Sequence, residues 1–129
     1  MKIEHLALNV KDPVAMADWY VANLGMRIAR QEGAPVHARF LADSSGAVML
    51  EVYHNAAEPV PDYFAMRPAT LHLAFCAQDV LAEAQRLVSA GASVFSEPGQ
   101  LPSGDTAAML RDPWGLSVQL VRRAKPMLA

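Results

Sequence analysis

The tripeptide His5-Leu6-Ala7 recurs 67 residues later as His72-Leu73-Ala74. Each copy opens an apolar run, and each run then meets an aspartate, Asp12 or Asp79, with the same offset of 67 residues (79 − 12). A second pair of similar triplets, Leu50-Glu51-Val52 and Val118-Gln119-Leu120, has an offset of 68 residues (119 − 51), so one residue has been inserted between the markers. Self-similarity at a fixed offset predicts that one structural unit occurs twice.

Both aspartates begin helical patterns. The carboxylate of Asp12 can accept from the free N–H groups of a first helical turn, and Pro13 suits the first helical position because it has no N–H to satisfy. Gly25 then supplies a C-terminal stop that tolerates positive φ. In the second unit Asp79 is the predicted N-cap and Gly91 the stop. We therefore expect one helix in each unit.

The remaining apolar segments indicate strands, and residues 55–68, which carry three prolines, indicate a linker. We predict an α+β fold with two βαβββ modules in a single domain of residues 1–129: module one is 1–54, the linker is 55–68 and module two is 69–129. The predicted strands are residues 3–10, 26–32, 36–43 and 48–54, followed by 71–77, 93–96, 106–111 and 116–122.

The composition limits the possible functions. Hydrophobic residues make up 53% of the 129 residues, charged residues 19%, and the net charge is −2 without a basic stripe, so we expect a globular core and no nucleic-acid partner. No apolar run approaches the ~20 residues that span a bilayer, and no signal peptide is visible, so we expect no membrane partner and a cytoplasmic location. We expect the single cysteine, Cys76, to be a buried inert thiol, and the cluster Arg122, Arg123 and Lys125 to be a solvated tail.

One residue that commonly binds metals lies near the middle of each of four strands. Because strand side chains alternate between faces, His5, Glu51, His72 and Gln119 fall on the more polar face of their strands. A mid-strand carboxylate costs several kcal/mol to bury unless it is paired. Glu51 could face solvent, pair with an arginine such as Arg39, or bind a cation. The equivalent positions favour the cation, because pseudo-twofold packing of the modules would bring all four side chains together.

The order of these motifs resembles that of the vicinal oxygen chelate superfamily, over nearly the whole chain. This superfamily includes glyoxalase I, methylmalonyl-CoA epimerase, fosfomycin-resistance proteins, extradiol dioxygenases and bleomycin-resistance proteins. The resemblance implies paired βαβββ modules that form an incomplete barrel around a metal. It rests on Ile3-Glu4-His5-Leu6-Ala7, Asp12-Pro13, Trp19-Tyr20, Leu24-Gly25-Met26, Leu71-His72-Leu73-Ala74, Arg111-Asp112-Pro113-Trp114-Gly115 and Val118-Gln119-Leu120.

The resemblance also implies a site. His5, Glu51, His72 and Gln119 match the family's metal ligands, which would hold one divalent ion such as Zn, Ni, Mn or Fe. Gln119 departs from the pattern, because the family usually has glutamate there, and in glyoxalase-I-like enzymes that glutamate is associated with proton transfer. An amide can ligate a metal but cannot act as a base, so we expect Glu51 to be the catalytic base.

Three functions remain open at this point. The first is a metal-dependent lyase or isomerase that acts on a small organic substrate through metal-chelated oxygens. The second is a metal-free ligand-binding protein of the bleomycin-resistance type, and the third is a small ligand-binding or regulatory domain. A homodimer is expected from the resemblance. Five apolar side chains either line the substrate cavity or simply fill the core: Phe40, Tyr53, Phe64, Met109 and Trp114.

Overall fold

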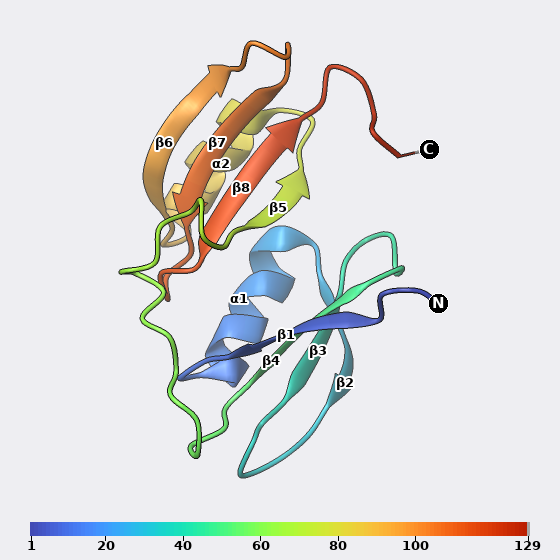
Figure 1. Cartoon of the computed structure of the whole chain (residues 1–129), viewed down its shortest axis with the longest axis vertical. Coiled ribbons are helices and arrows are strands. Elements are labelled where there is room, and N and C mark those ends of the chain that lie inside the picture. Colours follow the sequence, from blue (N-terminus) through green and yellow to red (C-terminus); the bar gives the residue numbers. More distant parts are fainter. Residues whose placement is uncertain (129) are drawn as a thin grey trace. The chain divides into compact units, whose positions relative to one another are not determined.

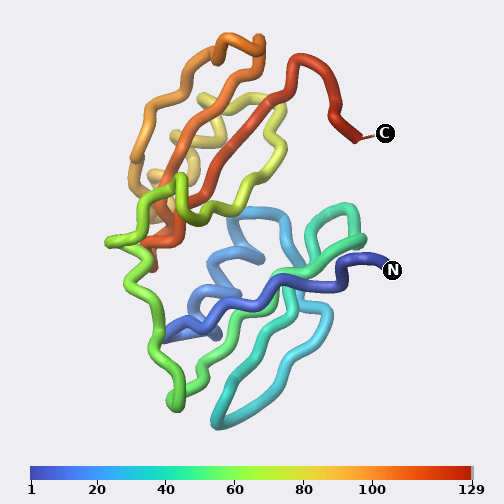
Figure 2. The backbone as a smooth tube through the Cα atoms, in the orientation of Figure 1, coloured from blue at the N-terminus to red at the C-terminus, as the bar shows by residue number. Residues whose placement is uncertain are grey.

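The computed structural model describes residues 1–128, and the chain divides into two compact units, Met1–Pro61 and the part from Asp62 onward (Figures 1 and 2). Each unit contains a four-stranded sheet and one helix. The predicted α+β class and the repeated βαβββ order are therefore confirmed. Among the described residues, no helix combines the length and the apolar character that crossing a membrane requires.

In the first unit the sheet has the order β1-β4-β3-β2. The strands β1 and β4 run parallel, which requires the crossover through α1, while the other neighbours are antiparallel. The helix covers one face of the sheet (Figure 1). The elements are β1 (His5–Asn9), α1 (Pro13–Leu24), β2 (Arg27–Gln31), β3 (Arg39–Ala42) and β4 (Met49–Tyr53).

The second unit repeats this topology with the order β5-β8-β7-β6. Again the first and last strands are parallel and the remaining pairs antiparallel. Both sheets are open, because neither closes on itself within its unit. The elements are β5 (Leu73–Cys76), α2 (Val80–Ser89), β6 (Ser93–Gln100), β7 (Thr106–Arg111) and β8 (Ser117–Arg122).

The two parallel strand pairs also share one register. Ala7 lies opposite Glu51 in the first unit, and Ala74 lies opposite Gln119 in the second. These are the positions that the sequence repeat makes equivalent. The extra residue in the second copy therefore leaves the pairing of β5 with β8 unchanged.

Each helix begins and ends as its local sequence dictates. The carboxylates of Asp12 and Asp79 accept from the backbone N–H groups of Ala15 and Ala82, both at 3.0 Å, which confirms the two predicted N-caps. The first helix ends at Gly25, where φ is 66°.

The core of each unit lies between its helix and the covered face of its sheet. Burying one such aliphatic or aromatic side chain stabilises the fold by about 1.5–3 kcal/mol. The opposite face of each sheet carries the predicted metal ligands of β4 and β8. The fully buried core side chains include Met16, Tyr20, Leu41 and Val52 in the first unit, and Leu87, Leu110 and Val118 in the second.

Most strands begin or end one to three residues inside their predicted bounds, and β3 begins three residues later than predicted, at Arg39. The strand β6 continues to Gln100, four residues beyond its predicted end at Ser96. Its pairing with β7 shifts register between Val94 and Ser96 and again between Ser96 and Gly99, and such irregularities accommodate Pro98, which has no N–H for the ladder. His72, predicted to lie within a strand, directly precedes β5.

Candidate functional site

The polar face of the first sheet brings two predicted metal ligands together. His5 begins β1 and Glu51 lies in the middle of β4, its parallel neighbour. The Nε2 atom of His5 lies 3.3 Å from Oε2 of Glu51, and the two side chains are 35% and 18% exposed. Strand pairing thus creates an imidazole–carboxylate pair that remains accessible from solvent.

A second carboxylate holds the other side of the His5 ring. Nδ1 of His5 lies 3.2 Å from Oε1 of Glu4. When Nδ1 carries the proton and donates to Glu4, the lone pair of Nε2 faces Glu51, another acceptor. In the other neutral tautomer Nε2–H donates to Glu51 instead, and a metal ion bound by Nε2 and Oε2 would select the first tautomer. The ring is also packed edge-on against Phe40 of β3, with 5.5 Å between ring centroids.

The separation of the two atoms is suitable for a shared metal ion. Bonds of about 2.0–2.2 Å from an imidazole nitrogen and a carboxylate oxygen, at tetrahedral or octahedral angles, place the two ligand atoms about 3–3.5 Å apart. The observed 3.3 Å lies within that interval. In distance, His5 and Glu51 are compatible with two ligands of one divalent ion.

In the second unit, a hydrogen bond likewise engages the Nδ1 atom of the histidine, His72. Nδ1 of His72 lies 2.8 Å from the carbonyl oxygen of Pro68. A carbonyl can only accept, so this hydrogen bond places the proton on Nδ1 and leaves the Nε2 lone pair free, the arrangement typical of metal-binding histidines. Gln119 is half-buried on β8, opposite Ala74 on one side and Met109 on the other.

The four predicted metal ligands are divided between the units, with His5 and Glu51 in the first and His72 and Gln119 in the second. Within residues 1–128, no three His, Cys, Asp or Glu side chains gather closely enough to hold a metal ion. The four-ligand set and the catalytic role of Glu51 therefore stay predictions.

Arg39 is not the partner of Glu51. Its side chain is engaged elsewhere, because Nη1 donates to the carbonyl oxygens of Glu32, His37 and Ala38 at 2.9–3.1 Å. The pairing of β3 with β4 places Arg39 opposite Val52, whose side chain faces the helix, and places Phe40 opposite Glu51. The possibility of an arginine pair is therefore wrong, and His5 takes that place.

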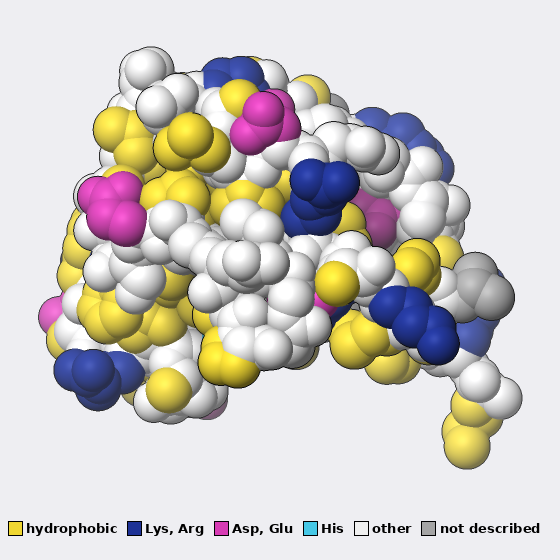
Figure 3. Space-filling model, turned by 90° about the horizontal axis from the view of Figure 1, so that it is seen from above, with side chains coloured by type: hydrophobic (Ala, Val, Ile, Leu, Met, Phe, Trp, Pro, Cys, Tyr) yellow, Lys and Arg dark blue, Asp and Glu magenta, His cyan; other side chains and the backbone are white. Residues whose placement is uncertain are grey.

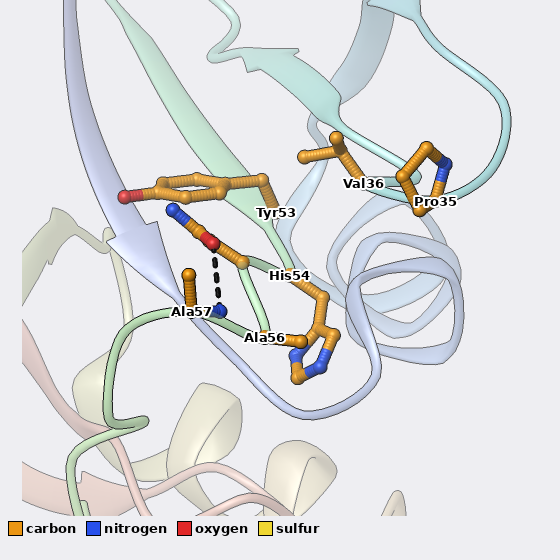
Figure 4. A pocket seen from close by; sticks show the side chains of 7 residues that line it. Pro35, Val36, Tyr53, His54, Ala56 and Ala57 are labelled. Carbon is orange, nitrogen blue, oxygen red and sulfur yellow. Dashed lines mark hydrogen bonds between the residues drawn. The ribbon is translucent and has the colours of Figure 1, made fainter.

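A small cavity lies at the end of β4, two residues beyond Glu51. It has a volume of about 380 Å³, and its walls include Tyr53, His54 and the loop residues Pro35 and Val36 (Figure 4). His54 is half-buried, and its Nδ1 contacts the carbonyl oxygen of Val10 at 2.8 Å. Of the predicted substrate-binding residues, Tyr53 lines this cavity and Phe40 contacts His5.

The other predicted substrate-binding residues belong to the second unit. Met109 neighbours Gln119 across the β7–β8 ladder and is half-buried. Phe64 is 58% exposed and packs over Gly115, where an added Cβ would come within 2.6 Å of it. Trp114 is half-buried in the turn between β7 and β8, and its backbone N–H donates to Asp112.

Arg111 orders the segment before His72 through hydrogen bonds to backbone carbonyl groups. Its guanidinium donates to the carbonyl oxygens of Tyr63, Met66 and Gly115, each at 2.9 Å. It also lies over the ring of Phe95, 5.4 Å from the centroid. Arg111 therefore fastens the segment before His72 onto β7, and the sequence signal for this role was a basic residue at the end of an apolar strand.

Hydrogen bonds to Asp105 also hold the C-terminal segment in place. Asp105 accepts from the backbone N–H of Ala124 at 2.8 Å and from Nη1 of Arg123 at 2.9 Å, and these hydrogen bonds hold the pKa of Asp105 below its usual value. The expectation of a solvated tail is therefore wrong for Arg123. The expectation of a buried thiol is also wrong, because Cys76 is exposed on the edge strand β5.

A family model described as the Glyoxalase/Bleomycin resistance protein/Dioxygenase superfamily matches residues 2–120. No curated protein matches the chain significantly in sequence.

Several solved structures have the same fold. The protein SMU.1112c is 27% identical with a TM-score of 0.74, and the match covers 95% of this chain and 98% of that one. A mutant of glyoxalase I from Zea mays is 25% identical with a TM-score of 0.77, over 96% of this chain and 46% of the maize chain. TnmS3, an antibiotic binding protein from Streptomyces sp. CB03234, is 21% identical with a TM-score of 0.74, over 96% and 97% of the two chains, and shows the fold alone.

Proposed function

Because the chain belongs to the Glyoxalase/Bleomycin resistance protein/Dioxygenase superfamily, we propose that it is a divalent-metal-dependent lyase or isomerase that acts on a small organic substrate. The observation that carries this proposal is the His5–Glu51 pair, in which Nε2 and Oε2 are 3.3 Å apart. With Nδ1 of His5 bonded to Glu4, the pair presents two acceptor atoms to one point, which suits a cation. We propose His5, Glu51, His72 and Gln119 as the metal ligands.

Each residue has a distinct proposed role. The bound metal would act as a Lewis acid that polarises adjacent oxygens of the substrate. His5 and His72 present Nε2 because Glu4 and Pro68 occupy their Nδ1 atoms. Gln119 can offer only an amide oxygen, so it cannot accept a proton from carbon. Glu51 is therefore the proposed base, which removes the acidic proton next to the substrate carbonyl and returns it to the neighbouring carbon.

The surroundings of Glu51 favour a partly apolar substrate. Phe40 lies opposite Glu51 on the neighbouring strand, and Tyr53 follows it on the same face of β4. We propose that these two side chains contact the substrate, together with Phe64, Met109 and Trp114 from the second unit. We also propose a cytoplasmic location, which the single unpaired cysteine supports. We propose a homodimer because dimers are common in this superfamily.

A metal-free binding protein is the second candidate. It is favoured by the fold shared with an antibiotic binding protein, and within residues 1–128 no three His, Cys, Asp or Glu side chains gather to hold a metal ion. In that case the proton, rather than a metal, would bridge His5 and Glu51.

One experiment separates the two candidates. Purified protein is analysed for metal by elemental analysis after dialysis, and is then assayed for proton exchange next to a carbonyl with added Ni²⁺, Zn²⁺ or Mn²⁺. The enzyme proposal expects about one metal ion per chain and exchange that stops when a chelator is added. If the protein neither retains nor binds any of these ions, the enzyme proposal is contradicted and the metal-free binding protein remains as the candidate.

A further inference from the structure

The second unit contains a larger cavity that the proposed chemistry does not use. It has a volume of about 610 Å³, within the range of pockets that hold small organic ligands. Its floor is formed by Ala74 and Cys76 of β5 and by Val121 of β8. Ala74 is opposite Gln119, and Cys76 is opposite Val121, so the floor continues the sheet face that carries Gln119. We call this cavity the tail groove.

The opposite wall of the tail groove is the C-terminal segment. Pro126, Met127 and Leu128 contribute apolar side chains to it. This segment is held in place just before the wall begins, because the carboxylate of Asp105 binds both the backbone N–H of Ala124 and the side chain of Arg123. Met127 and Leu128 are 73% and 88% exposed, so the groove is open to solvent along this wall, which is attached near Ala124.

The charge at the groove is positive. Arg122 and Arg123 both line it, and among its described lining residues there is no carboxylate. The guanidinium of Arg123 is paired with Asp105, whereas that of Arg122 has no hydrogen bond or ion pair within the described chain. Figure 3 shows one face of the molecule, on which apolar side chains reach the surface among lysine, arginine and acidic side chains. An apolar slot with an unpaired guanidinium at its rim favours a ligand of the same pattern.

We infer that the tail groove binds a small amphipathic anion, with its apolar body between β5 and the C-terminal segment and its acidic group at Arg122. A ring or a short alkyl chain that bears a carboxylate or sulfonate has this chemistry. The inference does not require a metal ion, so it stands or falls separately from the proposed enzyme activity.

The single thiol provides a direct test. Cys76 is the only cysteine in the sequence and lies on the floor of the groove, so its rate of alkylation by iodoacetamide reports whether the groove is filled. The probe is 1-anilinonaphthalene-8-sulfonate, an aromatic anion whose fluorescence rises in apolar surroundings. The protein is treated with a chelator first, so that metal binding does not contribute. We expect saturable one-site binding and slower alkylation of Cys76 at the same probe concentrations.

Variants test each part of the groove. Arg122→Gln should weaken probe binding roughly tenfold, the size expected for one charge-assisted contact at a partly exposed site. Arg30→Gln is the matched control, because Arg30 is an exposed arginine of the first unit, and it should leave binding unchanged. Met127→Glu should also weaken binding, and it should leave the fold intact because Met127 is 73% exposed. The neutral analogue N-phenyl-1-naphthylamine should bind Arg122→Gln and the natural protein equally.

Three results would overturn the inference. Probe binding that does not saturate would exclude a defined site. Saturable binding that leaves Cys76 alkylation unchanged would place the probe elsewhere. Equal affinity of the natural protein, Arg122→Gln and Met127→Glu for the anionic probe would exclude the proposed orientation.

Discussion

The imidazole of His5 and the carboxylate of Glu51 face each other across two parallel strands, with 3.3 Å between Nε2 and Oε2. The β1–β4 ladder fixes this relationship, because it pairs His5 with Met49 and Ala7 with Glu51 on a single face. The pair is only partly exposed, so the charge of the Glu51 carboxylate is screened less than that of a surface residue.

Glu51→Ala should lower the affinity for Zn²⁺ or Ni²⁺ by roughly a hundredfold, because it removes the only anionic ligand of the proposed set. Isothermal titration calorimetry measures the change, and circular dichroism verifies the fold. Glu97→Ala is the control, since Glu97 is an exposed carboxylate on β6. If Glu51→Ala binds metal as well as the natural protein, Glu51 is not a ligand.

Glu4→Ala should weaken metal binding less, by about tenfold, because Glu4 acts only through the orientation and basicity of His5. The conservative variant Glu4→Gln, whose amide oxygen can still accept from Nδ1, should recover part of the loss. Both variants should retain the stability of the natural protein, since the side chain of Glu4 is 68% exposed. An unchanged affinity in Glu4→Ala would show that the contact with His5 Nδ1 has no such role.

Arg111→Met should destabilise the fold by about 2–3 kcal/mol, because three carbonyl oxygens lose a charged donor while the apolar stem is largely kept. Urea unfolding followed by tryptophan fluorescence measures the free energy. Arg30→Met is the comparison, and it should change stability by less than about 0.5 kcal/mol, since Arg30 makes only an exposed ion pair. Equal effects of the two substitutions would contradict the role given to Arg111.

The lowered pKa of Asp105 predicts that the protein loses stability in acid. This pKa is lowered in the folded protein, chiefly by the hydrogen bond from the Ala124 N–H and then by Arg123. The folded state therefore favours the ionised form, so this contribution is complete above the ordinary Asp pKa of about 3.9 and is lost as the pH falls below it. Thermal unfolding of Asp105→Asn should consequently depend less on pH in that range than unfolding of the natural protein. Parallel pH profiles for the two proteins would exclude this contribution.

Much of the fold could be predicted from the sequence because its signals are local and repeated. The aspartate caps and the glycine stops indicated both helices, and the offset between His5 and His72 indicated the duplication. The division into modules 1–54 and 69–129 stays a prediction. The end of β6 was missed, because a proline and a glycine usually interrupt a strand, and here register shifts accommodate them.

The site was less predictable, because its contacts depend on which face each side chain reaches after folding. Alternation along β4 was sufficient to place Glu51 opposite the helix-covered face. Nothing in the sequence showed that Arg39 lies on the other face from Glu51, or that Asp105 meets Arg123 across 18 residues. Such pairings follow from bulges and loop paths, which carry weak local signals.

The shared register of the two halves restricts how each half can change in length. Inserting one residue near the start of β4 or β8 would move every following side chain to the other face of the sheet. Glu51 or Gln119 would then point into the hydrophobic core, and the neighbouring leucine would point into water. The odd residue in the second half must therefore have entered a connection or a bulge. Homologous chains should accordingly vary freely in their loops, while the spacing inside these two strands stays constant.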